Sequence, residues 1–70
     1  MVEKGLVKEF QNFLDGEKLN VEVRAVTVDG NQDSFKVKKV ILYGKDAEVA
    51  RNLLAGRYQI GLAYFEVQNE

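Results

Sequence analysis

Hydrophobic residues at the start of the chain recur at the spacing of an α-helix. They follow one another at intervals of four, four, three and one residue: Val2, Leu6, Phe10, Phe13 and Leu14. Charged and amide residues occupy most of the positions between them, so one face of the helix is apolar. The pattern predicts a helix over residues 2–14 that covers a sheet, and Gly16 is expected to provide the left-handed residue that ends it.

Residues 19–28 alternate between apolar and polar positions, as in a β-strand with one buried face. The apolar set on one face is Leu19, Val21, Val23 and Ala25. After Ala25 the apolar positions change phase to Val26 and Val28. A β-bulge or a sharp bend in the strand would produce this change.

The remaining pattern predicts a hairpin, a second helix and a last strand. Turn formers fill residues 29–33 and a β-rich run covers residues 35–43, which together indicate a hairpin. Asp46 is placed to cap a helix over residues 47–55, and Gly56 is expected to stop it. Residues 58–67 then alternate with apolar side chains on both faces, which indicates a strand covered twice or buried in an interface.

The predicted order is therefore α-β-β-α-β, an α+β fold with a small bent antiparallel sheet packed by two helices. Seventy residues suffice for a single core, so we expect one domain over residues 1–70.

The composition excludes several kinds of chemistry. The chain has no cysteine and no histidine, which removes disulfides, the usual zinc sites, thiol nucleophiles and the imidazole base. We therefore expect no enzyme, no catalytic residue, no metal and no cofactor. A hydrophobic content of 46% in so short a chain makes us expect a homo-oligomer. No apolar run resembles a signal peptide or spans a bilayer, so we expect a cytoplasmic protein without a membrane partner.

The charge pattern points to a partner. The net charge is −1, yet residues 34–45 carry lysines and no acidic residue. In an extended strand Lys39 shares a face with Phe35 and Tyr43. Aromatic rings that stack on bases, beside lysines that neutralise phosphates, are typical of single-strand binding. The alternative interpretation is that the rings belong to the core and the lysines protect an edge strand from self-pairing.

Residues 40–50, VILYGKDAEVA, followed by Leu53, Leu54 and Gly56, resemble the bacterial single-stranded DNA-binding protein (SSB) family. Residues 23–27 also resemble the preceding strand of that family, so the similarity covers about residues 19–62. The resemblance implies an oligonucleotide-binding (OB) fold, here as a reduced OB-like barrel. It also implies that Tyr43, before Gly-Lys, stacks on DNA and that Lys39, four positions earlier, lies beside it.

The leading functional hypothesis is a non-enzymatic module that binds single-stranded nucleic acid, with an affinity that falls as salt rises. Its predicted binding residues are Phe35, Lys36, Lys38, Lys39, Tyr43 and Lys45. The alternative is a small structural or protein-interaction module, of the phage or mobile-element accessory type, that assembles through its last strand.

Overall fold

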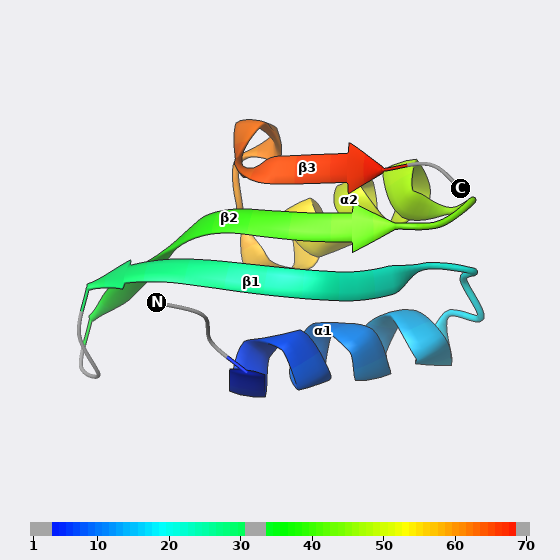
Figure 1. Cartoon of the computed structure of the whole chain (residues 1–70), viewed down its shortest axis with the longest axis horizontal. Coiled ribbons are helices and arrows are strands. Elements are labelled where there is room, and N and C mark those ends of the chain that lie inside the picture. The colour runs from blue at the N-terminus through cyan, green and yellow to red at the C-terminus, as the bar shows by residue number, and fades with distance from the viewer. Residues whose placement is uncertain (1–3, 31–33, 69–70) are drawn as a thin grey trace.

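A computed structural model describes residues 4–30 and 34–68 of the chain. Its elements are α1 (Lys4–Gly16), β1 (Glu22–Gly30), β2 (Phe35–Tyr43), α2 (Ala47–Tyr58), the 3₁₀ helix η1 (Leu62–Tyr64) and β3 (Phe65–Gln68) (Figure 1). The predicted α+β class and the order α-β-β-α-β are confirmed.

The three strands form one mixed sheet in the order β1-β2-β3. The predicted hairpin is present, because β1 pairs antiparallel with β2. The second pair differs from the prediction, since β3 runs parallel to β2 along residues 40–43. A parallel neighbour requires a crossover connection, and α2 provides it. Within the described residues β1 and β3 are the two edges of an open sheet, so these strands do not close into an OB-like barrel.

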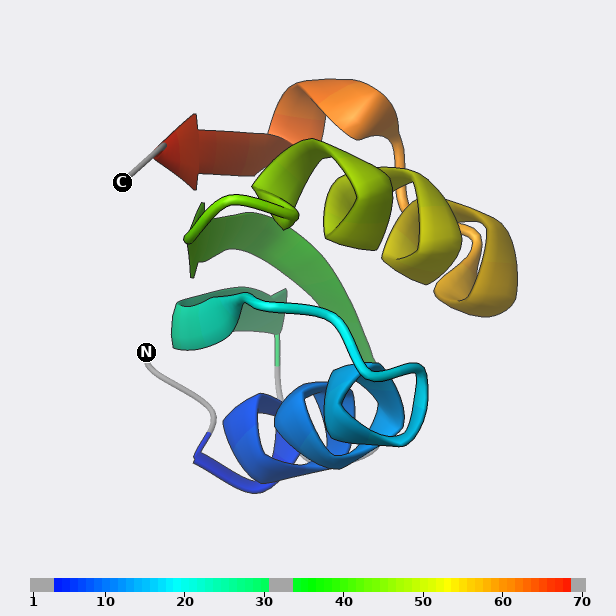
Figure 2. The same cartoon turned by 90° about the vertical axis from the view of Figure 1, so that its right-hand side faces the viewer.

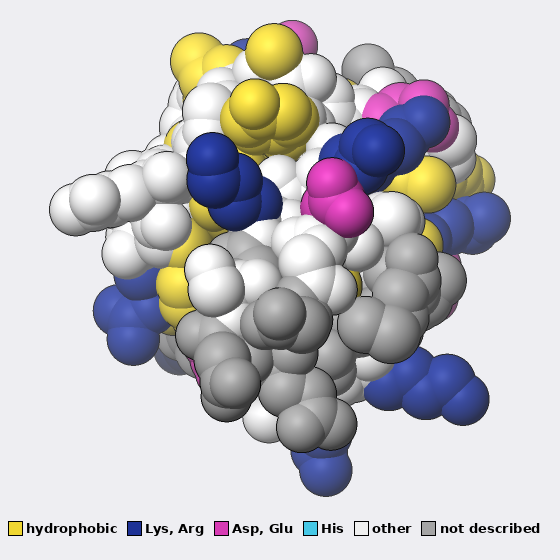
Figure 3. Space-filling view, turned by 90° about the vertical axis from the view of Figure 1, so that its left-hand side faces the viewer, with side chains coloured by type: hydrophobic (Ala, Val, Ile, Leu, Met, Phe, Trp, Pro, Cys, Tyr) yellow, Lys and Arg dark blue, Asp and Glu magenta, His cyan; other side chains and the backbone are white. Residues whose placement is uncertain are grey.

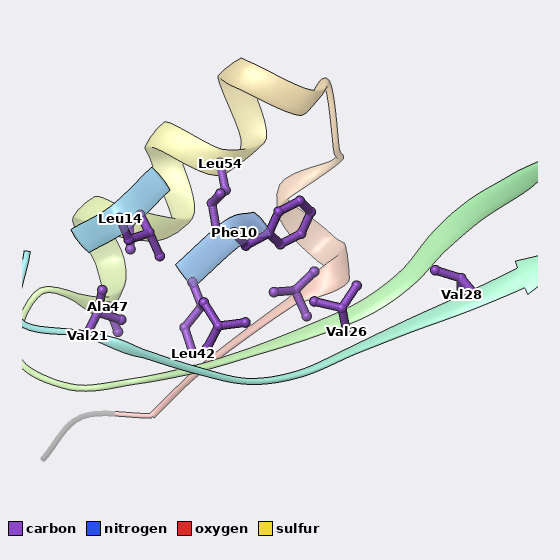
Figure 4. Packing of buried hydrophobic residues seen from close by; sticks show 11 residues of the cluster. Phe10, Leu14, Val21, Val26, Val28, Leu42, Ala47 and Leu54 are labelled. Carbon is purple, nitrogen blue, oxygen red and sulfur yellow. The ribbon is translucent and has the colours of Figure 1, made fainter. Parts of the chain in front are cut away.

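Both helices pack against the same face of this sheet (Figure 2). The buried side chains between the helices and the sheet are apolar, and Figure 4 shows how they meet. They are Phe10, Leu14, Val21, Val23, Val26, Val28, Val40, Leu42, Ala47, Ala50 and Leu54. The apolar face of α1 therefore has the role predicted for it, because it covers the sheet.

Aromatic rings connect the two helices directly. The ring of Tyr58, at the end of α2, lies 4.5 Å from that of Phe10 and 6.4 Å from that of Phe13, measured between centroids. The guanidinium carbon of Arg57 lies 4.7 Å from the Phe13 centroid. These contacts need Tyr58 on the helix, where its side chain is directed at α1.

The ends of both helices lie later than predicted. Gly16 is the last residue of α1 and Gly56 lies inside α2, and the left-handed residues are Lys18 (φ 59°) and Gln59 (φ 55°). α2 continues to Tyr58, whose packing on α1 stabilises the extra turn. The strand predicted over residues 58–67 is consequently wrong in extent, and β3 has only four residues.

Two irregularities in the β1–β2 pairing decide which side chains share a face. The first lies between Val23 and Ala25, so the predicted bulge is confirmed, with Arg24 as the extra residue. Ala25 is therefore on the face opposite Val23, contrary to the prediction. The second lies between Thr27 and Val28, with Lys38 of β2 as the extra residue. As a result Val37 packs against the core instead of sharing a face with Lys39.

The connection between β2 and α2 is hydrogen-bonded to the segment that precedes β1. Asp46 occupies the N-cap position of α2, as predicted, but its side chain makes no cap hydrogen bond. The backbone N–H of Asn20 instead donates to the Asp46 carboxylate (2.7 Å), and the Asp46 N–H donates to the Asn20 carbonyl (3.1 Å). Gly44 has φ +140°, and a Cβ there would lie 2.5 Å from that same carbonyl oxygen. The close approach therefore requires glycine.

Candidate functional site

The face of the sheet opposite the helices, which we call the open face, carries Tyr43 and Lys39, two of the predicted binding residues. Cross-strand partners share a face, and the pairs Val23–Leu42 and Val26–Val40 are buried. The alternate positions therefore form the open face. Over residues 22–27 of β1, 39–43 of β2 and 66–68 of β3, its side chains are those of Glu22, Arg24, Ala25, Thr27, Lys39, Ile41, Tyr43, Glu66 and Gln68.

Tyr43 is half-buried on the open face and lies under an arginine rather than under a helix. The guanidinium carbon of Arg24 is 4.2 Å from the ring centroid, within the range of a cation–π contact. The Arg24 Nε also donates to the Glu22 carboxylate at 3.0 Å. Arg24 is on this face by regular alternation, because Val23 before it is buried in the core, and the bulge places Ala25 on the same face.

Lys39 reaches across the open face to the edge strand. Its Nζ lies 3.1 Å from the Glu66 carboxylate, and the Gln68 amide donates to the other oxygen of Glu66 at 2.8 Å. The hydrogen bonds from Lys39 and Gln68, with the positive charge of Lys39, lower the pKa of Glu66. Both charged side chains keep about half of their surface exposed, at 51% and 42%. The Lys39 ammonium group is thus accessible but paired.

The structure divides the six residues predicted from sequence among different places. Lys39 and Tyr43 are together on the open face, with Ile41 between them. Lys36 and Lys38 are exposed near the hairpin end of β2 and line a groove on the helix side. Lys45 is exposed in the connection between β2 and α2. The backbone of Phe35 pairs with Gly30, and its side chain lies outside the described residues. The five of these side chains that the structure describes therefore do not form one surface.

Sequence reasoning missed four polar residues that surround Tyr43 and Lys39. They are Glu22, Arg24, Glu66 and Gln68. The alternation of residues 19–25 was a signal for Glu22 and Arg24, because it places both opposite Val23. No sequence pattern near Glu66 predicts its position beside Lys39, because that position depends on the parallel pairing of β3 with β2 after the α2 crossover.

The open face is electrically balanced. Its two cations, Arg24 and Lys39, face two carboxylates, Glu22 and Glu66, so its formal charge is zero. Within residues 4–30 and 34–68 no group of three or more acidic side chains is arranged to hold a metal ion. Nor does that part of the chain contain a helix long and apolar enough to cross a membrane.

Comparisons of the chain with protein-family models, with curated proteins and with solved structures find no match. The basis for a function is therefore the chemistry of the surfaces described above.

Proposed function

We propose that this chain is a non-enzymatic module that binds single-stranded nucleic acid on the open face of its sheet. Tyr43 stacks on a base, and Lys39 and Arg24 contact phosphates on either side. The observation that carries the proposal is the position of Tyr43, which lies against the guanidinium of Arg24 on the face opposite the two helices. The resemblance to the SSB family implies the same two β2 residues, Tyr43 and Lys39.

When nucleic acid binds on this face, its phosphates replace the carboxylates that contact Arg24 and Lys39 in the free protein. In the free protein Arg24 and Lys39 contact carboxylates at 3.0 and 3.1 Å, both with substantially exposed side chains. Exposed ion pairs of this kind contribute about 0–1 kcal/mol, so phosphates replace the carboxylates at little cost. Stacking of a base on an aromatic ring contributes about 1–3 kcal/mol. The ring therefore provides the larger part of the affinity, and the cations position the strand.

The decisive experiment is a fluorescence anisotropy titration of labelled oligo-dT with the full chain at low salt. Tyr43→Ala is expected to weaken binding by about 5- to 150-fold, the equivalent of one lost stacking contact. Lys39→Ala is expected to weaken it less. Matched controls are Tyr64→Ala, which removes an exposed ring from η1, and Lys8→Ala, which removes an exposed lysine from α1. Both controls should bind as the wild type does.

Salt dependence gives a second measure. For two phosphate contacts on a single strand, the affinity should fall about sevenfold between 50 and 200 mM salt. An anisotropy that does not respond to oligo-dT at low salt, or equal losses in the four variants, would refute binding on the open face.

A second candidate function is self-association along the β3 edge, and a specific observation favours it. Leu62 and Tyr64, directly before β3, are 54% and 50% exposed. β3 itself is an edge strand whose outer side has no neighbour among the described residues. Exposed apolar side chains beside an unpaired strand edge are typical of a pairing surface. Light scattering after size-exclusion chromatography tests this candidate, since Leu62→Ser should convert a dimer into a monomer, and a wild-type monomer at all concentrations would contradict it.

A further inference from the structure

A groove of about 640 Å³ lies on the helix side of the molecule, near the hairpin end of the sheet. Its floor and walls include Leu6 and Phe10 of α1, Val37 of β2, and the segment 58–61 with Tyr64. Figure 3 views this end of the molecule and shows Lys and Arg side chains standing beside exposed hydrophobic ones. The volume falls within the range of pockets that bind small organic molecules, about 300–1,000 Å³.

The groove exists because β3 is short. β3 pairs with β2 only along residues 40–43, so β2 residues 35–39 have no strand on that side within the described part of the chain. The chain from Gln59 to Tyr64 passes over this region as a loop and a 3₁₀ helix. Ile60 remains half-buried and Tyr64 is half-exposed, so apolar surface faces water. A ligand with an apolar body would displace that water favourably.

The rim of the groove carries a positive excess. Lys36 and Lys38 line it, and both side chains are exposed. The ion pairs found among the described residues involve neither of them. Asp29, the cross-strand partner of Lys36, is the acidic residue among the described residues that line the groove, and together these residues carry a net charge of +1. A ligand that fits both the rim and the walls is therefore anionic at one end and apolar over the rest.

We propose that this groove binds an amphipathic monoanion, with its apolar body against Phe10, Ile60 and Tyr64 and its charged group beside Lys36 and Lys38. Neither Tyr43 nor Lys39 lines this groove, so the proposal does not depend on nucleic-acid binding.

The test is a two-dimensional ¹⁵N–¹H NMR titration of the full chain with decanoate at neutral pH, below the concentration at which decanoate self-associates. Saturable shifts are expected at the amides of residues 36–38 and 58–61. Three comparators separate the parts of the ligand: acetate lacks the apolar body, decanol lacks the charge, and decyltrimethylammonium reverses it. Decanoate should bind more tightly than each of them. Equal binding of decanol or decyltrimethylammonium, or shifts spread evenly over the chain, would overturn the proposal.

Variants test the assignment of the charged group. Replacing both rim lysines, Lys36→Gln with Lys38→Gln, should weaken decanoate binding by about threefold to tenfold, as expected for the loss of two exposed ionic contacts. Decanol binding should not change. The matched control, Lys8→Gln with Lys45→Gln, removes two exposed lysines elsewhere and should leave decanoate binding intact. Equal weakening by the two pairs, or displacement of decanoate by oligo-dT with shifts at the same amides, would refute the site as a monoanion pocket.

Discussion

The guanidinium of Arg24 lies over the ring of Tyr43, with its carbon 4.2 Å from the ring centroid. The two residues come from neighbouring strands and meet on the open face, because Arg24 alternates with the buried Val23 and Tyr43 with the buried Leu42. This contact partly covers the ring that we propose as the stacking platform, and it holds a cation directly beside it.

A double-mutant cycle measures the contact. Arg24→Ala and Tyr43→Leu, singly and together, should give a coupling free energy of about 0.5–1 kcal/mol in urea unfolding, as for an exposed cation–π pair. The control cycle pairs Tyr43→Leu with Lys45→Ala, an exposed cation two residues away, and should be additive. Additive effects in the Arg24 cycle would show that the ring and the guanidinium do not interact in solution.

Removing the carboxylate that holds Lys39 should strengthen nucleic-acid binding. In Glu66→Gln the ammonium group of Lys39 loses its partner at 3.1 Å and a competitor for phosphate. We expect oligo-dT to bind roughly 1.5- to 5-fold more tightly, the equivalent of one exposed ion pair. Glu9→Gln on α1 changes the net charge equally and should have a smaller effect. A gain of equal size in both variants would indicate a general charge effect rather than a site at Lys39.

The pH dependence of the same pair has a defined sign. Hydrogen bonds from Lys39 and Gln68 lower the pKa of Glu66 in the folded protein. The carboxylate form is thus favoured by the fold, so the stabilisation is present at neutral pH and is lost as the pH falls through the folded pKa. An NMR titration of the Glu66 carboxyl should show that Lys39→Gln raises its pKa, whereas Lys38→Gln leaves it as in the wild type. An unchanged pKa in Lys39→Gln would mean that the ion pair does not persist.

Gln11 protects the free edge of β1, and its loss should be measurable. The Gln11 amide donates to the Val21 carbonyl at 3.1 Å and accepts from the Val23 N–H at 2.8 Å, in the manner of a neighbouring strand. Gln11→Ala should lower the free energy of unfolding by about 1–3 kcal/mol in a urea titration. Asn12→Ala, at the next and exposed position, should change it by less than about 0.5 kcal/mol. Equal stability of the two variants would mean that water replaces the amide without cost.

Two glycines should respond to alanine with opposite signs. At Gly44 the positive φ and the Asn20 carbonyl leave no room for a Cβ, so Gly44→Ala should destabilise the fold by at least about 1–3 kcal/mol. Gly56 is inside α2 with no atom within 4 Å of a Cβ, so Gly56→Ala should stabilise it by about 0.5–1 kcal/mol. Thermal unfolding of both variants checks this. Destabilisation by Gly56→Ala would support the helix end predicted from sequence instead.

Only part of the open face was predictable from the sequence. Alternation along β2 placed Tyr43 and Lys39 on one face correctly. The same alternation would place Val37 on the face of Lys39, but Val37 packs against the core, because the extra residue Lys38 shifts the alternation of residues 35–37 by one position. Such an irregularity depends on the partner strand, so no pattern within β2 alone could reveal it.

The sequence by itself determined the kind and order of the elements, because periodicity of 3.6 or 2 residues records which face of a segment is buried. It also indicated the bulge in β1 through the phase change beside Ala25. Only the tertiary structure decided where α2 ends, how β3 pairs and what lies beside Lys39. The physical reason is that each depends on residues distant in the chain: Tyr58 extends α2 by packing on Phe10, and the α2 crossover brings Glu66 to Lys39.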